Sequence, residues 1–292
     1  IMLFKEIIKK AVNKLPFSVQ KLVYLLWYEL HRPILDFFEI PINTPCLADP
    51  ITKSIKLVGF LKIYNEASTG NLERVLRHMS KFCDDIVVCD CASTDNSIEV
   101  AKRFTGHVIS DKNDIFNEIS TKQKMLDYAL QLKPDWIVWL DADEIFDREG
   151  ESGGVRKLCQ YGENNHIDGF SFLEYNLWEN LKCYRVDGLW HRVWFTRLWK
   201  NNGFLKFNVQ RGLHLQQYPE GLRNIKKSKI KVIHYGVSSP ELVRKKREFY
   251  KSCRRPAFFL KRYQKNSGIK TKLFHLDWFP ESAIKDDEYL KT

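Results

Sequence analysis

The feature that most constrains the fold is a regular alternation of strand-length apolar segments and amphipathic helical segments between residues 56 and 140. Strand–helix units of this length are typical of a parallel sheet with right-handed crossover connections. Ligands bind such sheets beyond the carboxyl ends of the strands. The predicted strands are 57–63, 86–89, 108–109 and 136–140, and the predicted helices between them are 70–82, 96–104 and 119–132.

Polar residues directly follow three of these strands. The first strand runs into Tyr64-Asn65-Glu66, the second into Asp90 and then Ser93-Thr94-Asp95, and the fourth into Asp141-Ala142-Asp143-Glu144. Because the carboxyl ends of parallel strands share one edge of a sheet, this edge is where we expect a ligand. The chain contains no Gly-x-Gly-x-x-Gly and no Gly-Lys-Ser/Thr sequence, which argues against a dinucleotide site or a P-loop.

The pair Asp141 and Asp143 indicates a particular chemistry. Two carboxylates one residue apart suit a hard divalent cation such as Mg2+ or Mn2+. Such a cation bridges a diphosphate and neutralises the charge on a leaving group. An Asp-x-Asp sequence is also common on solvated turns, but here the preceding Trp136–Leu140 segment places it at the end of a buried strand.

In order and spacing, the three motifs resemble those of family 2 glycosyltransferases. The matching segments are Phe60 through Glu66, Asp85 through Asp95, and Trp136 through Glu144. The resemblance covers about 55–145 closely and 197–236 more loosely. It implies an α/β GT-A fold, which is a Rossmann-like mixed sheet flanked by helices, and a nucleotide-diphosphate sugar as the donor. It does not indicate the sugar or the acceptor.

The resemblance also implies roles for individual positions in donor binding. Lys122 stands where the family usually has an Arg, and an ammonium cannot make the forked contact of a guanidinium. The implied contacts are Tyr64 and Glu66 with the nucleoside, Asp90 with the base, Lys122 with the base or the phosphates, Asp141 with the ribose, the donor sugar or the metal, and Asp143 with the metal.

Two later segments, Arg197-Leu198-Trp199 and His234-Tyr235-Gly236, are also similar to the family. In GT-A enzymes a late His often completes the metal site, and neutral imidazole is a competent Mn2+ ligand. His234, at a predicted strand end, is the better placed candidate, and His214 is the other. Many relatives have a Glu directly after the histidine that corresponds to His214. Here Leu215 stands in its place, so a mechanism that uses that Glu is not implied.

An inverting transfer also needs a carboxylate that deprotonates the acceptor hydroxyl. The candidates are Glu174, Glu179 and Asp187. Asp187 is favoured because it lies between two aromatic stretches that would form an acceptor cleft, although it could instead form a structural pair with Arg185 or Arg192. A retaining mechanism stays open.

The sequence predicts three regions. Residues 1–54 form an N-terminal extension with helices at 1–15 and 17–31 and a proline-rich linker. Residues 55–236 form the GT-A domain, with a nucleotide-binding half at 55–148 and an acceptor half at 149–236. Residues 237–292 form a basic helical region. Beyond residue 150 the predicted strands are 170–175, 193–199 and 230–235, and the predicted helix is 239–264.

Charge is unevenly distributed along the chain. The net charge of +11 arises from −3 in residues 1–150 and +14 in the remainder, and residues 222–272 contain 17 Lys and Arg against two Asp and Glu. Such a block favours a polyanionic partner, namely a membrane surface, a nucleic acid or a phosphorylated acceptor. The alternative is a solvated basic face.

Two acceptors and one non-enzymatic function are therefore considered. The first acceptor is a cell-envelope glycan or lipid-linked intermediate, with the enzyme held at an anionic membrane by its amphipathic N-terminus and basic region. The second is a hydroxylated base in DNA, because Tyr250, Phe258, Phe259 and Tyr263 lie among the basic residues. The non-enzymatic function is that of a non-catalytic protein that binds sugar or nucleic acid.

Seven cysteines in no metal-binding spacing indicate reduced thiols. No apolar run approaches the length of about 20 residues that spans a bilayer, and lysines interrupt the N-terminal apolar residues, so no signal peptide is expected. We therefore expect a cytoplasmic protein, either free or peripheral to the inner face of the membrane.

Overall fold

The computed structural model describes residues 41–43, 54–112, 118–187, 190, 193–207, 218–252, 260, 263, 269–281 and 283. By internal contacts the chain divides into two units, Ile1–Pro41 and Ile42–Thr292, and all elements below belong to the second. The predicted helices at 1–15 and 17–31, most of the predicted linker, and His214 lie outside the described residues.

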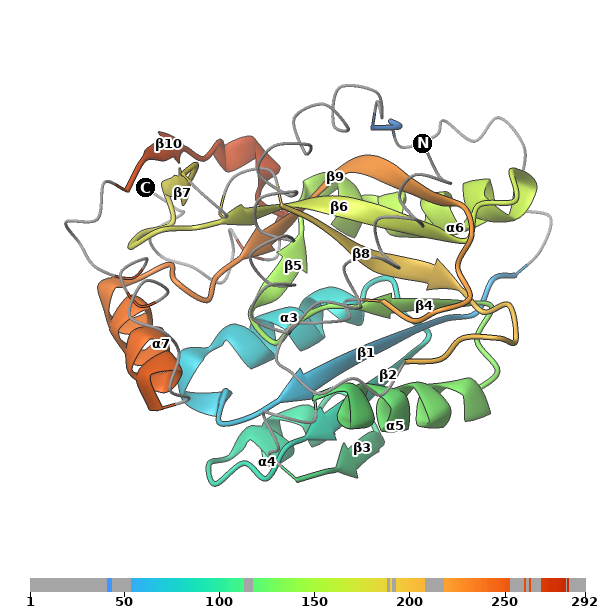
Figure 1. Ribbon diagram of the computed structural model, residues 1–292, viewed down its shortest axis with the longest axis horizontal. Coiled ribbons are helices and arrows are strands. Elements are labelled where there is room, and N and C mark those ends of the chain that lie inside the picture. Colours follow the sequence, from blue (N-terminus) through green and yellow to red (C-terminus); the bar gives the residue numbers. More distant parts are fainter. Residues whose placement is uncertain are drawn as a thin grey trace, which may run out of the picture. The chain divides into compact units, whose positions relative to one another are not determined.

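A mixed sheet of eight strands organises the described part of the second unit (Figure 1). Its order is β3-β2-β1-β4-β8-β6-β9-β5. The first four strands are parallel, β8 is antiparallel to both β4 and β6, β9 is parallel to β6, and β5 is antiparallel to β9. The strands are β1 (Leu57–Ile63), β2 (Asp85–Asp90), β3 (His107–Ser110), β4 (Trp136–Trp139), β5 (Glu144–Phe146), β6 (Gly169–Asn176), β8 (Val193–Lys200) and β9 (Ile225–His234).

Helices cover both faces of this sheet. The helices are α3 (Asn71–Met79), α4 (Ser97–Lys102), α5 (Glu118–Gln131), α6 (Val155–Asn164) and α7 (Pro240–Ser252). Short helical turns occur at Ala67–Thr69, Gly150–Gly154 and Leu276–Trp278, and β7 (Cys183–Arg185) pairs with β10 (Thr271–Leu273) in a separate ribbon. The predicted α/β fold class, a Rossmann-like mixed sheet flanked by helices, is confirmed.

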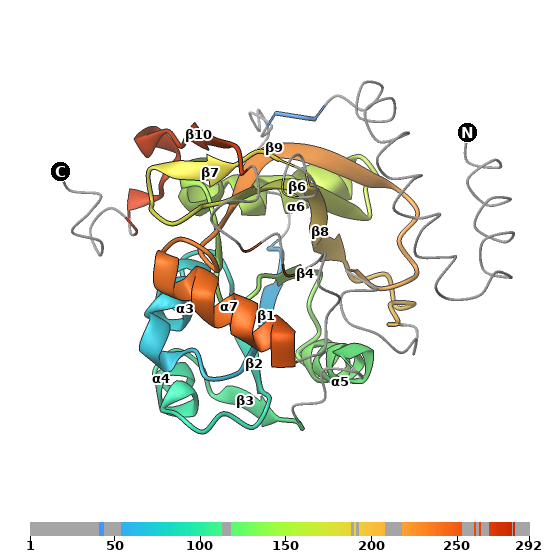
Figure 2. The same cartoon turned by 60° about the vertical axis from the view of Figure 1, so that its left-hand side comes forward.

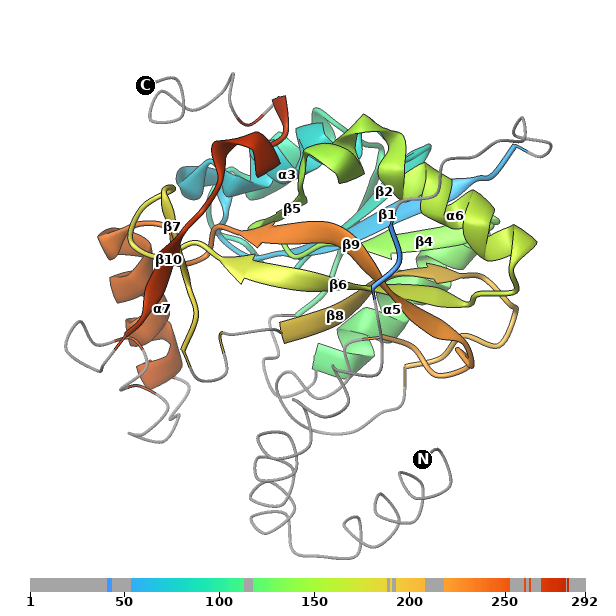
Figure 3. The same ribbon diagram turned by 90° about the horizontal axis from the view of Figure 1, so that it is seen from above.

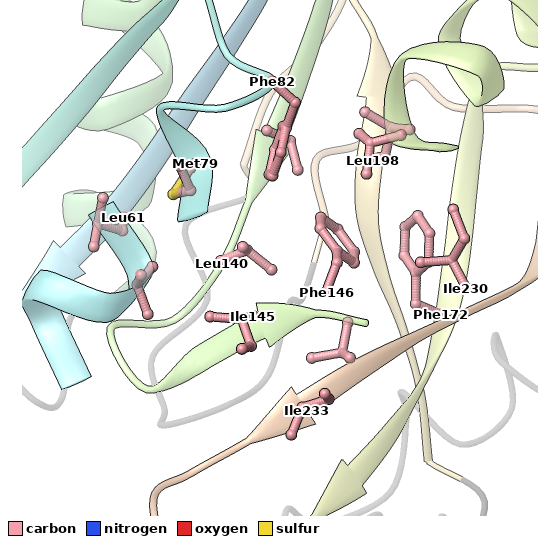
Figure 4. Close-up of a cluster of buried hydrophobic side chains, with 14 of the residues drawn as sticks. Leu61, Met79, Phe82, Leu140, Ile145, Phe146, Phe172, Leu198, Ile230 and Ile233 are labelled. Carbon is pink, nitrogen blue, oxygen red and sulfur yellow. The ribbon is translucent and has the colours of Figure 1, made fainter. Parts of the chain in front are cut away.

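Alternation along the central strands produces two hydrophobic layers. In β1, Leu57, Leu61 and Ile63 pack into the layer that α3, α4 and α6 cover, whereas Val58 and Phe60 pack into the layer under α5. Successive side chains of a strand point to opposite faces, so a strand that is buried on both faces must be apolar throughout. Figure 4 shows the first layer where it continues past β4 into β5 and β9.

The sheet curls strongly after β4. Five residue steps separate Trp139 from Glu144, a reach of at most about 18 Å. A flat sheet would place β4 and β5 four strand spacings apart, or roughly 19 Å, with no length left for the loop between them. The second half of the sheet, where β9, β6 and β8 run side by side (Figure 3), therefore folds back toward the end of β4. This curl brings β9 beside the acidic loop.

Two further sequence expectations bear on the described residues. The five cysteines that the structure places, Cys83, Cys89, Cys91, Cys159 and Cys183, are free thiols, as predicted. Within the described ranges, no helix has both the length and the apolar character needed to cross a membrane.

Candidate active site

The loops that follow β1 and β2 are joined to each other by hydrogen bonds. The Asn65 N–H donates to Ser93 Oγ (3.0 Å), and Asn65 Oδ1 accepts the Thr94 N–H (2.7 Å). Asn65 has a φ of 53°, a left-handed conformation that Asn tolerates better than most residues. Asp90 is buried and its Oδ2 accepts the Ser93 N–H (3.1 Å). The structure thus brings Tyr64, whose side chain is exposed, and Asp90 to one edge of the sheet.

Glu66 belongs to the same edge. Its N–H donates to Ser97 Oγ (2.9 Å), and its carboxyl group accepts the Thr69 hydroxyl (3.1 Å). Burial, together with the negative charge of Asp143, raises the pKa of Glu66 to about 7. Glu66 therefore titrates near neutral pH. Because the charge of Asp143 contributes to this shift, the loop after β1 and the acidic loop after β4 interact electrostatically.

The two aspartates of the acidic loop have separate partners. Asp141 Oδ2 accepts a hydrogen bond from Arg197 Nη2 (2.8 Å), and Arg197 also pairs with Glu144. Glu144 folds back so that its Oε2 accepts the Asp141 N–H (3.1 Å). Burial raises the pKa of Glu144 well above its ordinary value although Arg197 opposes this shift. Arg197 comes from β8 and is 1% exposed, so this half of the loop is held by a buried guanidinium.

Asp143 faces two nitrogen atoms. Its Oδ2 lies 3.1 Å from His234 Nε2 and 3.3 Å from Lys246 Nζ, and the two nitrogens are 3.3 Å apart. The β5–β9 pairing sets Glu144 opposite His234, and the Tyr235 N–H donates to the Asp143 carbonyl (2.7 Å). Burial alone would raise the pKa of Asp143, but Lys246 and His234 outweigh it and the net shift is downward. The carboxylate is therefore ionised.

Gly236 is required for this close approach. A Cβ at this position would overlap the Asp143 carboxylate and lie 2.5 Å from Lys246 Nζ and 2.6 Å from His234 Nε2. These distances are shorter than real Cβ contacts, so any other residue would push the three groups apart. The polar cluster of Asp143, His234 and Lys246 thus lies directly against bare backbone.

The orientation of His234 follows from its other neighbours. Asn176 Nδ2 donates to Glu174 Oε1 (2.7 Å), so Asn176 Oδ1 faces His234 Nδ1 at 2.6 Å and accepts a hydrogen bond from the Nδ1–H group. A neutral His234, the form that can ligate a metal, would therefore carry its hydrogen on Nδ1 and present the lone pair of Nε2 toward Asp143 and Lys246. Donation of the second ring N–H to a fixed acceptor is the usual arrangement behind a metal-ligating His. Nε2 is therefore prepared to bind a cation.

The cluster fits a divalent cation in its donor set. The Asp143 carboxylate oxygen suits either Mg2+ or Mn2+, and the His234 imidazole nitrogen suits Mn2+ better than it suits Mg2+. The Lys246 ammonium, close to both atoms, already stands in as a cation. No group of three or more His, Cys, Asp or Glu side chains gathers closely enough to hold a metal ion within the described residues. The described residues would thus supply two ligands, Asp143 and His234, and a diphosphate or water could supply others.

Lys122 is buried, so its side chain is not openly accessible to a ligand. Its side chain is 1% exposed, its Nζ is 4.5 Å from the centre of the Trp139 ring, and it pairs with Glu118 at 3.3 Å. Burial lowers the pKa of Lys122, while Glu118 and Asp141 oppose this shift. Lys122 is therefore a buried cation within electrostatic range of Asp141.

The candidate bases occupy different positions. Asp187 binds Arg185 through both of its oxygens, each at 2.8 Å, and its Oδ1 also accepts the Lys270 N–H (3.0 Å). The structure thus shows the pairing with Arg185 that the sequence left as the alternative. Glu174 is half-buried on β6, and Asn176 connects it to His234. Glu179 has a φ of 55° in the turn after β6.

Two functional residues of the cluster were not predicted. Asn176 gave no signal, because an isolated Asn at a strand end is common. For Lys246 the signal in the sequence was weak. It lies at helical spacing between Val243 and Tyr250, two apolar positions that the structure shows to be buried. A lysine on the buried face of a basic helix requires a partner, and that partner is Asp143.

No family model matches the chain, and no curated protein matches it. A mannosyltransferase from Pyrobaculum calidifontis in complex with GDP-Man and Mn2+ is similar in structure, with 14% identity and a TM-score of 0.44 over 80% of this chain and 75% of that one. TarS from S. aureus in complex with UDP has 12% identity and a TM-score of 0.37 over 72% and 69%.

A third similar structure is glucosyl-3-phosphoglycerate synthase from Mycobacterium tuberculosis in complex with Mn2+, UDP and glucosyl-3-phosphoglycerate. It has 17% identity and a TM-score of 0.32 over 47% of this chain. The match covers 52% of the synthase, so the chain spans about half of its length. The chain is thus similar in structure to proteins whose bound ligands include GDP-Man, UDP and Mn2+.

Proposed function

We propose that this chain is a metal-dependent glycosyltransferase that moves a sugar from a nucleotide-diphosphate sugar to an acceptor hydroxyl. The observation that carries the proposal is the cluster of Asp143, His234 and Lys246 beside the loops that follow the parallel strands. A carboxylate, an imidazole with a fixed tautomer and an ammonium at one point suit a metal-bound diphosphate.

In this proposal the donor lies along the carboxyl edge of the sheet. Mn2+ or Mg2+, held by Asp143 and His234, would neutralise the charge that develops on the departing diphosphate. The roles inferred for the remaining residues are Tyr64 and Glu66 beside the nucleoside, Asp90 at the base, Asp141 at the ribose or donor sugar, and Lys122 as a buried positive charge within electrostatic range of Asp141.

The chain's own residues would then prepare the acceptor. The acceptor hydroxyl loses its proton to a carboxylate while its oxygen forms the new glycosidic bond and the bond to the diphosphate breaks. Of the three candidate bases predicted from the sequence, Glu174 is the best supported, because it is connected to the cluster through Asn176. Asp187 already has both oxygens in an ion pair. Direct displacement of this kind would invert the anomeric centre.

For the acceptor, we favour a cell-envelope glycan or lipid-linked intermediate over a hydroxylated DNA base. Tyr250 and Tyr263, two of the aromatics proposed to stack on bases, are instead buried against each other with ring centres 5.5 Å apart. The basic character itself is present on the surface and supports a polyanionic partner. The exposed basic residues of β9, the loop before it and α7 are Arg223, Lys226, Lys229, Arg244, Lys245 and Lys251.

The proposal keeps the three predicted regions, 1–54, 55–236 and 237–292, in a cytoplasmic protein, with α7 of the third region contributing Lys246 to the site in the second. Binding of anionic vesicles and of duplex DNA, each titrated with salt, separates the two acceptors. For duplex DNA, log affinity falls with log salt at a slope of about −0.9 per phosphate neutralised. Vesicle binding that is lost when residues 1–30 are deleted supports the envelope acceptor, whereas tight duplex binding that survives the deletion supports DNA.

The activity itself is tested by screening nucleotide sugars for hydrolysis and binding with Mn2+ present. We expect one donor to be hydrolysed slowly, release of its nucleoside diphosphate to stop on chelation of the metal, and activity to return when Mn2+ is restored. Failure to bind any nucleoside diphosphate or nucleotide sugar, with or without metal, would overturn the proposal and favour a non-catalytic binder.

A further inference from the structure

Lys246 occupies the position at which a cation would meet both Asp143 and His234. Its Nζ lies 3.3 Å from Asp143 Oδ2 and 3.3 Å from His234 Nε2, and these two atoms are 3.1 Å apart. The ammonium is therefore equidistant from the two prospective ligand atoms. It donates toward the same lone pairs that a metal ion would need.

This arrangement satisfies a charge that would otherwise be costly. The side chain of Asp143 is only 18% exposed, and a poorly solvated carboxylate needs a cation close by. Arg197 cannot serve, because it is bound to Asp141 and Glu144. Within the described residues, Lys246 is the lysine or arginine that pairs with Asp143.

A metal ion and this ammonium cannot share the two atoms. The backbone at Gly236 lies so close to the cluster that not even a Cβ fits beside the three groups. A divalent ion bound to Oδ2 and Nε2 would also be repelled by a positive charge a few ångströms away. Binding of the ion therefore requires the ammonium to leave.

The side chain can move without moving its helix. Val243 and Tyr250 anchor α7 on either side of Lys246, and Tyr250 packs on Tyr263. Lys246 itself is 26% exposed and carries its charge on a flexible four-carbon stem. Figures 1 and 2 both show α7 beside the carboxyl ends of the parallel strands, where the proposed donor lies.

We propose that Lys246 is a resident counter-cation of the Asp143–His234 pair, that a divalent ion displaces it, and that the displaced ammonium then pairs with the donor's diphosphate. The inference rests on the proposed function. It makes Lys246 a residue with opposite effects on two binding steps, since it opposes the metal alone and favours the metal together with a diphosphate. A residue that only stabilised the fold would weaken both steps.

The test compares wild type with Lys246→Met and with Lys245→Met as a matched control. Lys245 is the preceding residue of the same helix and forms an exposed pair with Glu241, so its removal changes net charge equally. Mn2+ binding is measured by calorimetry at neutral pH, first with Mn2+ alone and then with inorganic pyrophosphate. Circular dichroism confirms that each variant is folded, and Lys246→Arg is included to restore the charge.

We expect Lys246→Met to bind Mn2+ alone at least about tenfold more tightly than wild type, because a neighbouring positive charge is gone. With pyrophosphate the order should reverse, Lys246→Met being at least about tenfold weaker and Lys246→Arg close to wild type, because a positive charge again pairs with phosphate oxygens. Lys245→Met should change neither value appreciably.

Two results would overturn the inference while leaving the proposed function in place. One is unchanged or weaker Mn2+ binding by Lys246→Met in the absence of pyrophosphate. The other is an equal response of the Lys245 and Lys246 variants, which would indicate the general field of a basic helix. If instead no protein, wild type included, retained Mn2+ with pyrophosphate or a nucleoside diphosphate, the proposed function would fail together with the inference.

Discussion

At the acidic loop, the two aspartates follow the parallel half of the sheet, and the side chains that pair with them come from the other half and the helix after it. The parallel half, β3-β2-β1-β4, ends in carboxylates, hydroxyls and an amide. The other half, β8-β6-β9-β5, and the helix after it supply the imidazole and the cations that pair with the two aspartates: Arg197 from β8, His234 from β9 and Lys246 from α7. The acidic loop joins the halves, since it leaves β4 and enters β5. The site therefore exists only when the sheet has curled.

The same comparison distinguishes the two aspartates. Asp141 is held by a buried guanidinium that is fixed between the Trp139 and Phe195 rings, 5.2 and 5.0 Å from their centres. Asp143 is held by a more exposed and flexible ammonium. One side of the loop is thus structurally fixed, and the other is free to exchange its cation. The predictions below test this asymmetry.

The largest effect is expected from Asp143→Asn, which removes the charge that faces both His234 and Lys246. Transfer and metal-dependent donor binding should fall by at least about a hundredfold, since the loss of a metal-ligating charge exceeds that of an outer hydrogen bond. The fold should remain, because the Tyr235 N–H bond to the Asp143 carbonyl is kept. Steady-state kinetics and thermal unfolding measure the two effects.

The matched control is Asp127→Asn, an exposed carboxylate of α5 that accepts a hydrogen bond from Gln123 within the same helix. It should change neither activity nor melting temperature. Full activity of Asp143→Asn would contradict the assignment of the exchangeable side of the loop.

The second prediction concerns stability on the fixed side. Arg197→Met should destabilise the fold by about 3–5 kcal/mol, because Glu144 and Asp141 lose the guanidinium that compensates them. Urea unfolding at neutral pH gives this value. Lys200→Met on the same strand removes a partly exposed pair with Glu163 and should cost less than about 1 kcal/mol. Equal costs for the two variants would mean that the buried guanidinium has no special structural role.

The third prediction isolates the parallel half. Asp90→Ala should weaken binding of a nucleoside diphosphate by about 1–3 kcal/mol, the cost of a lost buried hydrogen bond. Binding of Mn2+ with pyrophosphate should be unchanged, because that ligand has no base. Asp90 Oδ2 also accepts the Ser93 N–H (3.1 Å). Unchanged nucleotide affinity in a calorimetric titration would reduce Asp90 to that turn-forming role.

The parallel half was predictable because its strands β1, β2 and β4 are buried on both faces. The predicted strand 57–63 matches β1 at both ends, and the strand at 136–140 exceeds β4 by one residue. The acidic loop was found for the same reason, since carboxylates after an apolar run contrast sharply with it. Local pattern and tertiary environment agree in this half.

The second half was harder to predict because its elements depend on partners distant in sequence. β5 has only three residues, too few for any periodicity to show, and β9 begins at Ile225, where lysines conceal a strand that was predicted only from Ile230. α6 follows a glycine-rich turn and was not predicted. The role of Lys246 depends on contacts with Asp143 and His234 that only the curled sheet creates.

The last prediction uses the opposite edge of the parallel half, where the strands begin. Lys56 Nζ and Asp85 Oδ2 form an ion pair at 2.9 Å between the starts of β1 and β2, with both side chains partly exposed. The hydrogen bond from Lys56 lowers the pKa of Asp85. A depressed folded pKa adds stability above the unfolded value of about 3.9, and this contribution is lost as pH falls through the folded value.

Asp85→Asn should therefore lower the free energy of unfolding by less than about 1 kcal/mol at pH 7. The difference from wild type should stay constant down to about pH 5 and shrink below about pH 4. Donor binding should not change, because the site lies at the carboxyl ends of the strands and this pair at their amino ends. Urea titrations across this pH range, paired with nucleotide titrations at pH 7, test both statements. If Asp85→Asn weakened nucleotide binding as much as Asp90→Ala, the contrast between the two edges would be lost, and with it the argument that charge placement at the carboxyl edge defines the site.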